Sequence, residues 1–107
     1  MARAAAPVRV QILQEARDDL AAGRDFYDAR RPGVGDYFAM ALATDIAAIG
    51  LTPGIHPIVS GFHRALSRRF PAGIFYLIED ASVRVYAVLD LRRDPAWILR
   101  QLHRGED

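Results

Sequence analysis

The chain has 107 residues, of which 51% are apolar and 25% are charged, and its formal net charge is +1. This is the size and balance of one globular domain, so we predict a single domain over residues 1–107 with its core at about 8–102. The chain contains no cysteine, which excludes a disulfide framework, a thiolate metal site and a cysteine nucleophile.

The first part of the chain predicts a strand followed by a helix. Residues Val8–Leu13 alternate between apolar and polar side chains, which indicates a half-buried strand. Over about Glu15–Ala29 apolar residues recur every three or four positions, so we predict a helix with charged residues such as Asp19 on its solvated face. The Arg30–Gly33 segment ends this helix, because its proline disfavours the helical conformation of the residue before it.

A second helix is predicted over about Asp36–Leu51, where one apolar stripe begins at Phe38 and ends at Ile49. Two helices joined by a short loop with glycine and proline are expected to form an antiparallel hairpin. The Thr52–Gly61 segment contains two prolines and two glycines, so we predict an irregular connection there.

Three antiparallel strands are predicted next, over His63–Arg69, Ile74–Ile78 and Val83–Leu89. Pro71–Gly73 is interpreted as a turn or bulge, and Glu79–Ser82 as a tight hairpin connection. In the last strand, the side chains expected on one face are those of Val83, Val85, Ala87 and Leu89, and those on the other face belong to Arg84, Tyr86 and Val88.

A short C-terminal helix is predicted to begin at Asp94 and Pro95, an N-cap followed by proline in the first turn, and to be anchored on the core by Trp97. The element order is therefore β-α-α-β-β-β-α. The predicted fold class is α+β, an antiparallel sheet with the helical hairpin packed on one face and the short helix at the C-terminal end.

The basic residues indicate a local basic face. All fourteen are arginine, and the segment from Phe62 to Arg93 holds six of them against three acidic residues. Guanidinium groups can bind phosphate or carboxylate in a bidentate manner, whereas the alternative is solvated arginines that pair within the chain. The candidate functional residues on this face are Arg64, Arg68, Arg69, Tyr86, Arg92 and Arg93.

Other polar side chains are given structural roles. We expect Tyr76 and Tyr86 to cover the sheet with their hydroxyl groups in water, and Asp90 to pair with Arg92 or Arg93. The sequence predicts no metal site, because His56, His63 and His103 lie far apart, and His63 and His103 are expected at the surface. No cofactor is predicted.

The N-terminal residues lack the apolar segment of a signal peptide, and no apolar stretch approaches the roughly 20 residues that span a bilayer. We therefore expect a cytoplasmic protein that makes no membrane contact.

Residues Ala65–Leu102 resemble the C-terminal half of the RelE/ParE superfamily, toxins of type II toxin–antitoxin systems that are often called plasmid stabilisation proteins. The resemblance rests on FPAGIFYLI at Phe70–Ile78, VRVYAV at Val83–Val88 and RRDPAW at Arg92–Trp97, and upstream on EARDDL at Glu15–Leu20. Three positions differ from the family pattern: Ala72 stands where tyrosine is usual, Asp90 where histidine is usual, and Leu77 where arginine is common.

The resemblance implies a toxin that a cognate antitoxin neutralises. The favoured target is a topoisomerase such as DNA gyrase, inhibited without chemistry as in the ParE-like branch, because the departures at Ala72 and Asp90 leave the arginines without obvious proton-transfer partners. The alternatives are a RelE-like endoribonuclease that cuts mRNA on the ribosome, and a degenerate member that binds antitoxin without toxicity.

The expected partner is a small DNA-binding antitoxin encoded next to the toxin, whose C-terminal segment wraps around it. The candidate antitoxin-binding residues are Tyr27, Tyr37 and Met40, exposed along the helical hairpin. No sequence-specific DNA binding by the toxin itself is expected.

Overall fold

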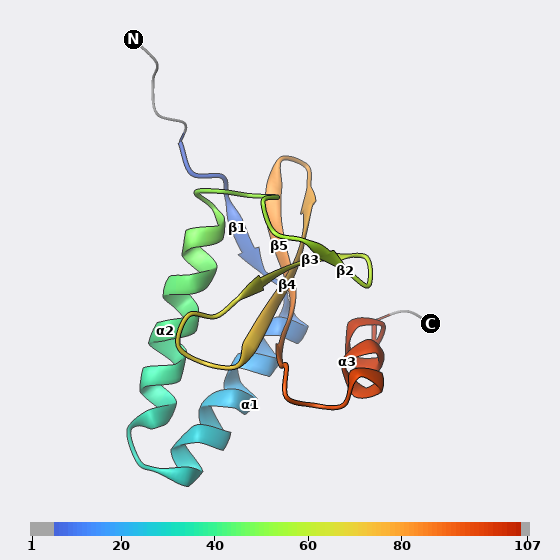
Figure 1. The fold of residues 1–107 in the computed structure, drawn as a ribbon. Helices are drawn as coiled ribbons and strands as arrows, with labels where there is room; N and C mark the ends of the chain where they lie inside the picture. Colours follow the sequence, from blue (N-terminus) through green and yellow to red (C-terminus); the bar gives the residue numbers. More distant parts are fainter. Residues whose placement is uncertain (1–5, 106–107) are drawn as a thin grey trace.

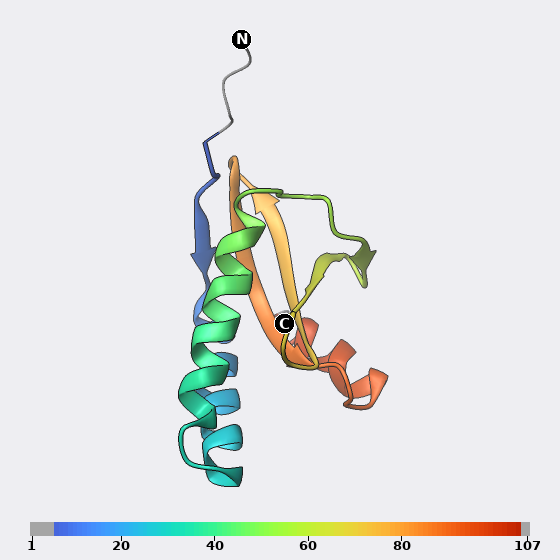
Figure 2. The same cartoon turned by 60° about the vertical axis from the view of Figure 1, so that its left-hand side comes forward.

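The computed structural model describes residues 6–105. Its elements are β1 (Val10–Ile12), α1 (Gln14–Arg30), α2 (Val34–Ile49), β2 (Ile58–Val59), β3 (Phe62–Leu66), β4 (Ala72–Glu79), β5 (Ser82–Asp90) and α3 (Pro95–Leu102). The five strands form one sheet in the order β1-β5-β4-β3-β2. The α1–α2 hairpin covers one face of this sheet and α3 lies on the other, as Figures 1 and 2 show from two directions. The predicted α+β class and helical hairpin are confirmed.

The sheet is mixed, whereas a purely antiparallel sheet was predicted. β1 runs parallel to β5, with Val10 opposite Val83 and Ile12 opposite Val85, while the β2–β3, β3–β4 and β4–β5 pairs are antiparallel. Short connections favour antiparallel pairing, but both helices and strands β2–β4 lie between β1 and β5 in the chain. A crossover of that length permits a parallel neighbour.

The predicted irregular connection at Thr52–Gly61 contains one further short strand. β2 pairs with β3, with Ile58 opposite His63 and Val59 opposite Phe62. Ser60 and Gly61 join the two strands with φ angles of 54° and 87°. Two consecutive residues with positive φ give the turn whose twist suits a two-residue hairpin, so a strand forms despite the nearby proline and glycine.

The third predicted strand is shorter than expected, because β3 ends at Leu66 and not at Arg69. Asp45 of α2 accepts hydrogen bonds from the Ser67 hydroxyl (2.7 Å) and from the Arg68 amide (3.2 Å). These bonds draw the chain toward α2 and take Arg68 and Arg69 out of the sheet. β4, in turn, begins earlier than predicted, at Ala72.

A bulge in β5 changes the predicted orientation of its side chains. Val85 lies opposite Tyr76 and Ala87 lies opposite Phe75, so Tyr86 is an extra residue in the ladder. Beyond the bulge the alternation is inverted. Val83, Val85 and Val88 therefore join the core beneath the helices, whereas Ala87 and Leu89 join a smaller core on the α3 side.

The C-terminal helix begins as predicted, with the Asp94 carboxylate accepting from the Ala96 amide at 3.1 Å and Pro95 in the first turn. Trp97 is half-buried against the smaller core, but the buried anchor of α3 is Leu102. Within residues 6–105, none of the helices combines the length and the hydropathy that a bilayer crossing requires.

Candidate functional site

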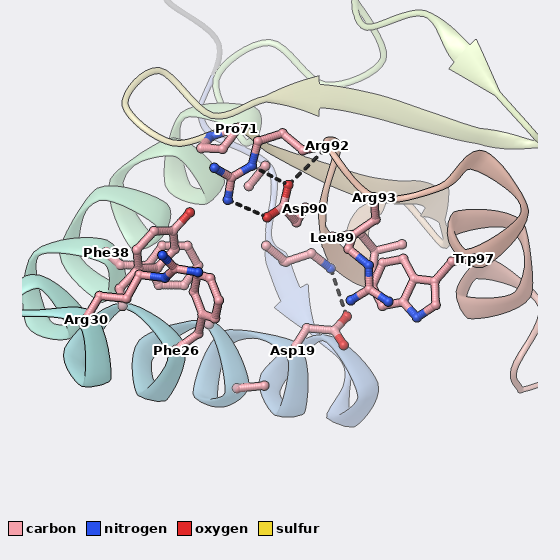
Figure 3. Close-up of a pocket in the computed structure, with 15 residues that line it drawn as sticks. Asp19, Phe26, Arg30, Phe38, Pro71, Leu89, Asp90, Arg92, Arg93 and Trp97 are labelled. Atoms are coloured by element: carbon pink, nitrogen blue, oxygen red, sulfur yellow. Dashed lines mark hydrogen bonds and ion pairs between the residues drawn. The ribbon is translucent and has the colours of Figure 1, made fainter.

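A cleft of about 540 Å³ opens between α1 and the C-terminal part of β5. α1 contributes one wall and Phe38 of α2 the base, while Val88–Asp90 of β5 and the segment that leads to Trp97 of α3 form the opposite wall. Figure 3 shows Arg30 and Phe26 at one side of the cleft and Arg93 and Trp97 at the other. The lining is largely apolar, with charged groups around the opening.

The cleft exists because β1 is much shorter than β5. β1 ends opposite Val85, and β5 continues to Asp90 with β4 on one side but no strand on the edge that β1 occupies. The helices below are close together, since a Cβ atom added at Gly23 would lie 2.6 Å from the ring of Phe38. α1 runs beside the part of β5 that β1 does not cover, and the cleft lies between α1 and β5.

Asp19 and Arg104 cover the first backbone groups of this uncovered edge. The Asp19 carboxylate accepts from the Val88 amide at 2.9 Å and forms a two-pronged ion pair with Arg104, at 2.8 and 3.0 Å. Arg104 also donates to the Tyr86 carbonyl at 3.3 Å. The side chains of Asp19 and Arg104 are only 15% and 24% exposed. Asp19 was predicted on a solvated helix face, but it joins α1, β5 and the end of α3.

Asp90 and Arg92 form a second bidentate pair at the rim. The Asp90 carboxylate accepts from the Arg92 guanidinium at 2.7 and 3.1 Å and from the Arg92 amide at 2.9 Å. The guanidinium hydrogen bond lowers the pKa of Asp90, and the carboxylate in turn raises the pKa of Arg92. The expected pairing of Asp90 is observed, with Arg92 as its partner.

Two other arginines at the cleft lie over aromatic rings. The Arg30 guanidinium is 4.4 Å from the centroid of Phe26, and that of Arg93 is 3.9 Å from the ring of Trp97. Neither forms an ion pair with another residue of the described chain. Both therefore keep a positive charge at the opening, held in place by cation–π contact.

A chain of aromatic contacts leads from the cleft to the hairpin surface. Tyr27 packs against Phe70 at 4.8 Å, Phe70 against Tyr37 at 5.5 Å, and the Tyr37 hydroxyl accepts from Arg69 at 2.8 Å. Two predicted antitoxin-binding residues, Tyr27 and Tyr37, thus lie on one surface with Arg69. Met40 is 71% exposed on α2.

The predicted arginine cluster is divided between two faces of the molecule. Arg92 and Arg93 line the cleft, and Arg69 binds Tyr37 of α2. Arg68 is exposed beside α2. Arg64 lies opposite Phe75, so its side chain belongs to the α3 face of the sheet.

Tyr86 also lies on the α3 face and donates from its hydroxyl to Glu79 at 2.6 Å. This hydrogen bond, together with burial, raises the pKa of Tyr86. Its hydroxyl is therefore bound to a carboxylate, whereas water was expected as its environment.

Sequence patterns did not indicate the His56–Tyr76–His63 cluster. Tyr76 is fully buried, where a hydroxyl in water was expected, and it accepts from the Gly54 amide at 3.1 Å and lies 2.6 Å from Nδ1 of His56. His63 was expected at the surface, but it stacks on Tyr76 at 5.0 Å and donates from Nδ1 to the His56 carbonyl at 2.8 Å. The cause is the 52–57 segment, which folds over β4.

Burial shifts the pKa values of His56 and Tyr76. It lowers the pKa of His56, with a smaller contribution from His63, and it raises the pKa of Tyr76. The neutral imidazole of His56 is the form that accepts the hydrogen bond from the Tyr76 hydroxyl. No spacing in the sequence connects residues 20 positions apart, so only the fold reveals this cluster.

No family model matches the chain, and no curated protein matches it by sequence. Its fold matches a chain in the solved structure described as "Chromosomal ParDE TA system from P. aeruginosa". The TM-score is 0.68 at 14% sequence identity, over 76% of this chain and 92% of that chain. The fold that the resemblance implies is thus confirmed: this protein has the fold of a chain from a ParDE toxin–antitoxin system.

Proposed function

We propose that this protein is the toxin of a type II toxin–antitoxin pair and that it inhibits a topoisomerase such as DNA gyrase by binding, without chemistry. The observation that carries the proposal is the bidentate Asp90–Arg92 pair at the cleft rim. The Asp90 carboxylate already accepts from two donors of the Arg92 guanidinium. A phosphate that approached Arg92 would find these donors occupied and would be repelled by the negative charge of Asp90.

Acid–base groups near the arginines are also unsuited to RNA cleavage. Such cleavage needs a proton acceptor and a proton donor poised beside the phosphate clamp. The Tyr86 hydroxyl donates a hydrogen bond to Glu79, and its raised pKa keeps it protonated at neutral pH, so it is not available as a base. Asp90 has a lowered pKa, so it is a weak proton donor at neutral pH. Ala72, buried at the start of β4, has no titratable group.

Protein binding needs no such groups, and the surface around the cleft has the anchors that protein interfaces use. Aromatic residues and arginine carry most of the binding energy at such interfaces. Here Arg30 lies over Phe26, Arg93 lies over Trp97, and the Tyr37 hydroxyl binds Arg69. Their side chains are already held in place, so binding would cost little conformational entropy.

One observation favours mRNA cleavage as the second candidate. The Nε atoms of Arg64 and Arg84 are buried, and no hydrogen-bond partner for either lies within residues 6–105. In the strand register, Arg64 lies opposite Phe75 and Arg84 lies opposite Leu77 of β4. Phe75 and Leu77 belong to the core on the α3 side, so both arginine side chains lie on that face of the sheet. Two arginines on one face could hold a phosphate.

The partner in the proposed function is a small DNA-binding antitoxin encoded beside the toxin, and the proposed location is the cytoplasm. The ParDE toxin–antitoxin system, which contains the chain that shares this fold, supports an antitoxin as the partner. We propose that it contacts Tyr27, Tyr37 and Met40 and that the toxin makes no sequence-specific contact with DNA. Co-expression of the neighbouring small gene should increase the yield and solubility of this protein.

The test is to induce the protein in cells and to follow transcripts and chromosome integrity together, with the purified protein added to gyrase in parallel. DNA breaks with intact transcripts, and loss of that damage in Arg93→Glu, are expected. Early site-specific mRNA cuts that disappear in the Arg64→Ala/Arg84→Ala variant would overturn the topoisomerase target. Absence of any phenotype would identify a protein that only binds antitoxin.

A further inference from the structure

The cleft beside β5 has a rigid aromatic base. The ring of Tyr27 stacks on that of Phe38 at 5.1 Å and makes an edge-to-face contact with Phe26, also at 5.1 Å. Phe70 supports this base, since it packs edge-on against Tyr27 at 4.8 Å and against Phe38 at 5.0 Å. Each ring is held by another ring, so the cleft keeps its shape without a ligand, as preformed binding sites do.

The size and the lining of the cleft suit a small aromatic molecule. Its volume of about 540 Å³ lies in the range of sites that bind small organic ligands. Trp97 lies on the far side of the cleft from Phe26 and Phe38, so flat rings line it on two sides (Figure 3). Aromatic rings attract one another beyond the effect of apolar burial, and an aromatic ligand therefore gains most from these walls.

The two carboxylates in the lining are already neutralised. Asp90 forms its ion pair with Arg92, and Asp19 forms one with Arg104. The Asp19 carboxylate also accepts from the Val88 amide at 2.9 Å. An anion that enters the cleft therefore meets no uncompensated negative charge.

Two cations remain available at the opening, Arg30 and Arg93. Their guanidinium groups lie 4.4 Å from the centroid of Phe26 and 3.9 Å from that of Trp97, and neither is in an ion pair among residues 6–105. At these distances each guanidinium covers a ring face, whereas its N–H donors point outward in its own plane. Those donors can bind a carboxylate in a bidentate manner.

We propose that the cleft is a binding site for a small aromatic carboxylic acid, whose ring lies between Trp97 and the aromatic base and whose carboxylate binds Arg93. Arg30 adds a second positive charge on the opposite side of the opening. A neutral aromatic molecule would gain the ring contacts alone, and an aromatic cation would be repelled by both arginines. Binding of such an acid requires neither an antitoxin nor a target, so it can be measured on the purified chain.

The test titrates the purified protein with naphthoate and with naphthamide, which has the same ring system without the charge. Trp97 is the only tryptophan of the chain, so one indole N–H signal in a nitrogen–proton correlation spectrum reports on the cleft. Naphthoate should shift this signal saturably, and naphthamide should bind about tenfold more weakly. Equal affinity of the two probes, or no saturable shift with naphthoate, would show that the proposal is wrong.

Two matched pairs of variants locate the binding. Arg93→Gln should weaken naphthoate binding by about tenfold, unlike Arg100→Gln on the exposed side of α3. Ala22 lines the cleft from α1, whereas Ala21 lies on the same helix outside it, so Ala22→Leu should weaken binding and Ala21→Leu should leave it unchanged. All four positions are exposed, so the substitutions should leave the fold intact. If either cleft variant binds naphthoate as tightly as its control, the acid does not bind as proposed.

Discussion

At the scale of single residues, Asp19 is the side chain on which most of the local structure depends. One carboxylate binds a backbone amide of β5 and the guanidinium of Arg104, so it joins residues that are 69 and 85 positions away in the chain. Its sequence context, among other charged residues of an amphipathic helix, predicts a solvated position. Long-range partners of a charged residue cannot be read from local periodicity, which explains why Asp19 was missed.

Replacement of Asp19 should destabilise the fold more than replacement of its neighbour. Asp19→Ala leaves the Val88 amide without its acceptor and Arg104 without its counter-charge, and we expect a loss of about 2–3 kcal/mol. Asp18→Ala, at an exposed position, should cost about 0.5 kcal/mol or less. Urea unfolding of both variants measures the difference, and equal losses would show that the ion pair contributes little.

The His56–Tyr76 hydrogen bond should make stability depend on pH. Burial lowers the pKa of His56 in the folded state, so the unfolded chain binds a proton more readily. The stability contribution of neutral His56 is therefore complete above its ordinary pKa of 6.5 and is lost as the pH falls toward the folded value. Unfolding of the protein and of His56→Gln at pH 5.5–7.5 should show a slope that the variant reduces.

At the scale of elements, the helices and strong strands were predictable and the irregular features were not. The periodicity of residues 14–49 gave both helices to within two residues of their observed ends. The bulge at Tyr86 was missed, because an extra residue in a ladder depends on the partner strand, and the sequence of β5 by itself does not mark where the alternation of its side chains inverts. The parallel direction of β1 was missed because local sequence contains no information on pairing across 70 residues.

The candidate site was predictable to a similar extent. The RRDPAW segment drew attention to Arg92 and Arg93, and the structure places both residues in the lining of the cleft. The count of arginines from Phe62 to Arg93 grouped Arg64 with them, although β3 carries Arg64 to the opposite face of the sheet. The face of the sheet on which a side chain lies depends on where the strand ends and on bulges. A count of arginines in a segment of sequence detects neither.

The β4–β5 turn offers a stabilising substitution. Asp80 and Ala81 have φ angles of 52° and 58°, in the left-handed region that alanine disfavours. Ala81→Gly should therefore stabilise the protein by about 0.5–1 kcal/mol, because the strained position gains a residue without a Cβ atom. Ala43→Gly, on the exposed side of α2, should instead cost about 1 kcal/mol. Thermal unfolding distinguishes the two, and destabilisation by both would refute the strain argument.

At the scale of the whole molecule, the sheet separates two cores of unequal size. The larger lies under the helical hairpin and contains Leu42, Ile74 and Tyr76, whereas the smaller is formed by Phe62, Phe75 and their neighbours under α3. α3 is a short helix with one buried residue, so its attachment depends on Leu102 and on the ion pair of Arg104. The same attachment positions Trp97 at the cleft.

Leu102 therefore offers a test of whether the smaller core maintains the cleft. Leu102 is 8% exposed and Leu99, on the same helix, is 45% exposed, so they form a matched pair. Leu102→Ala should cost about 2–3 kcal/mol, since it leaves a cavity against Phe62 and Leu89, and Leu99→Ala should cost well under half of that. Amide exchange in α3 should rise only in the Leu102 variant, and naphthoate binding should weaken with it, because Trp97 and Arg93 lose their fixed positions. An α3 that stays protected after Leu102→Ala would show that Arg104 alone holds the helix, and the cleft would then be independent of the smaller core.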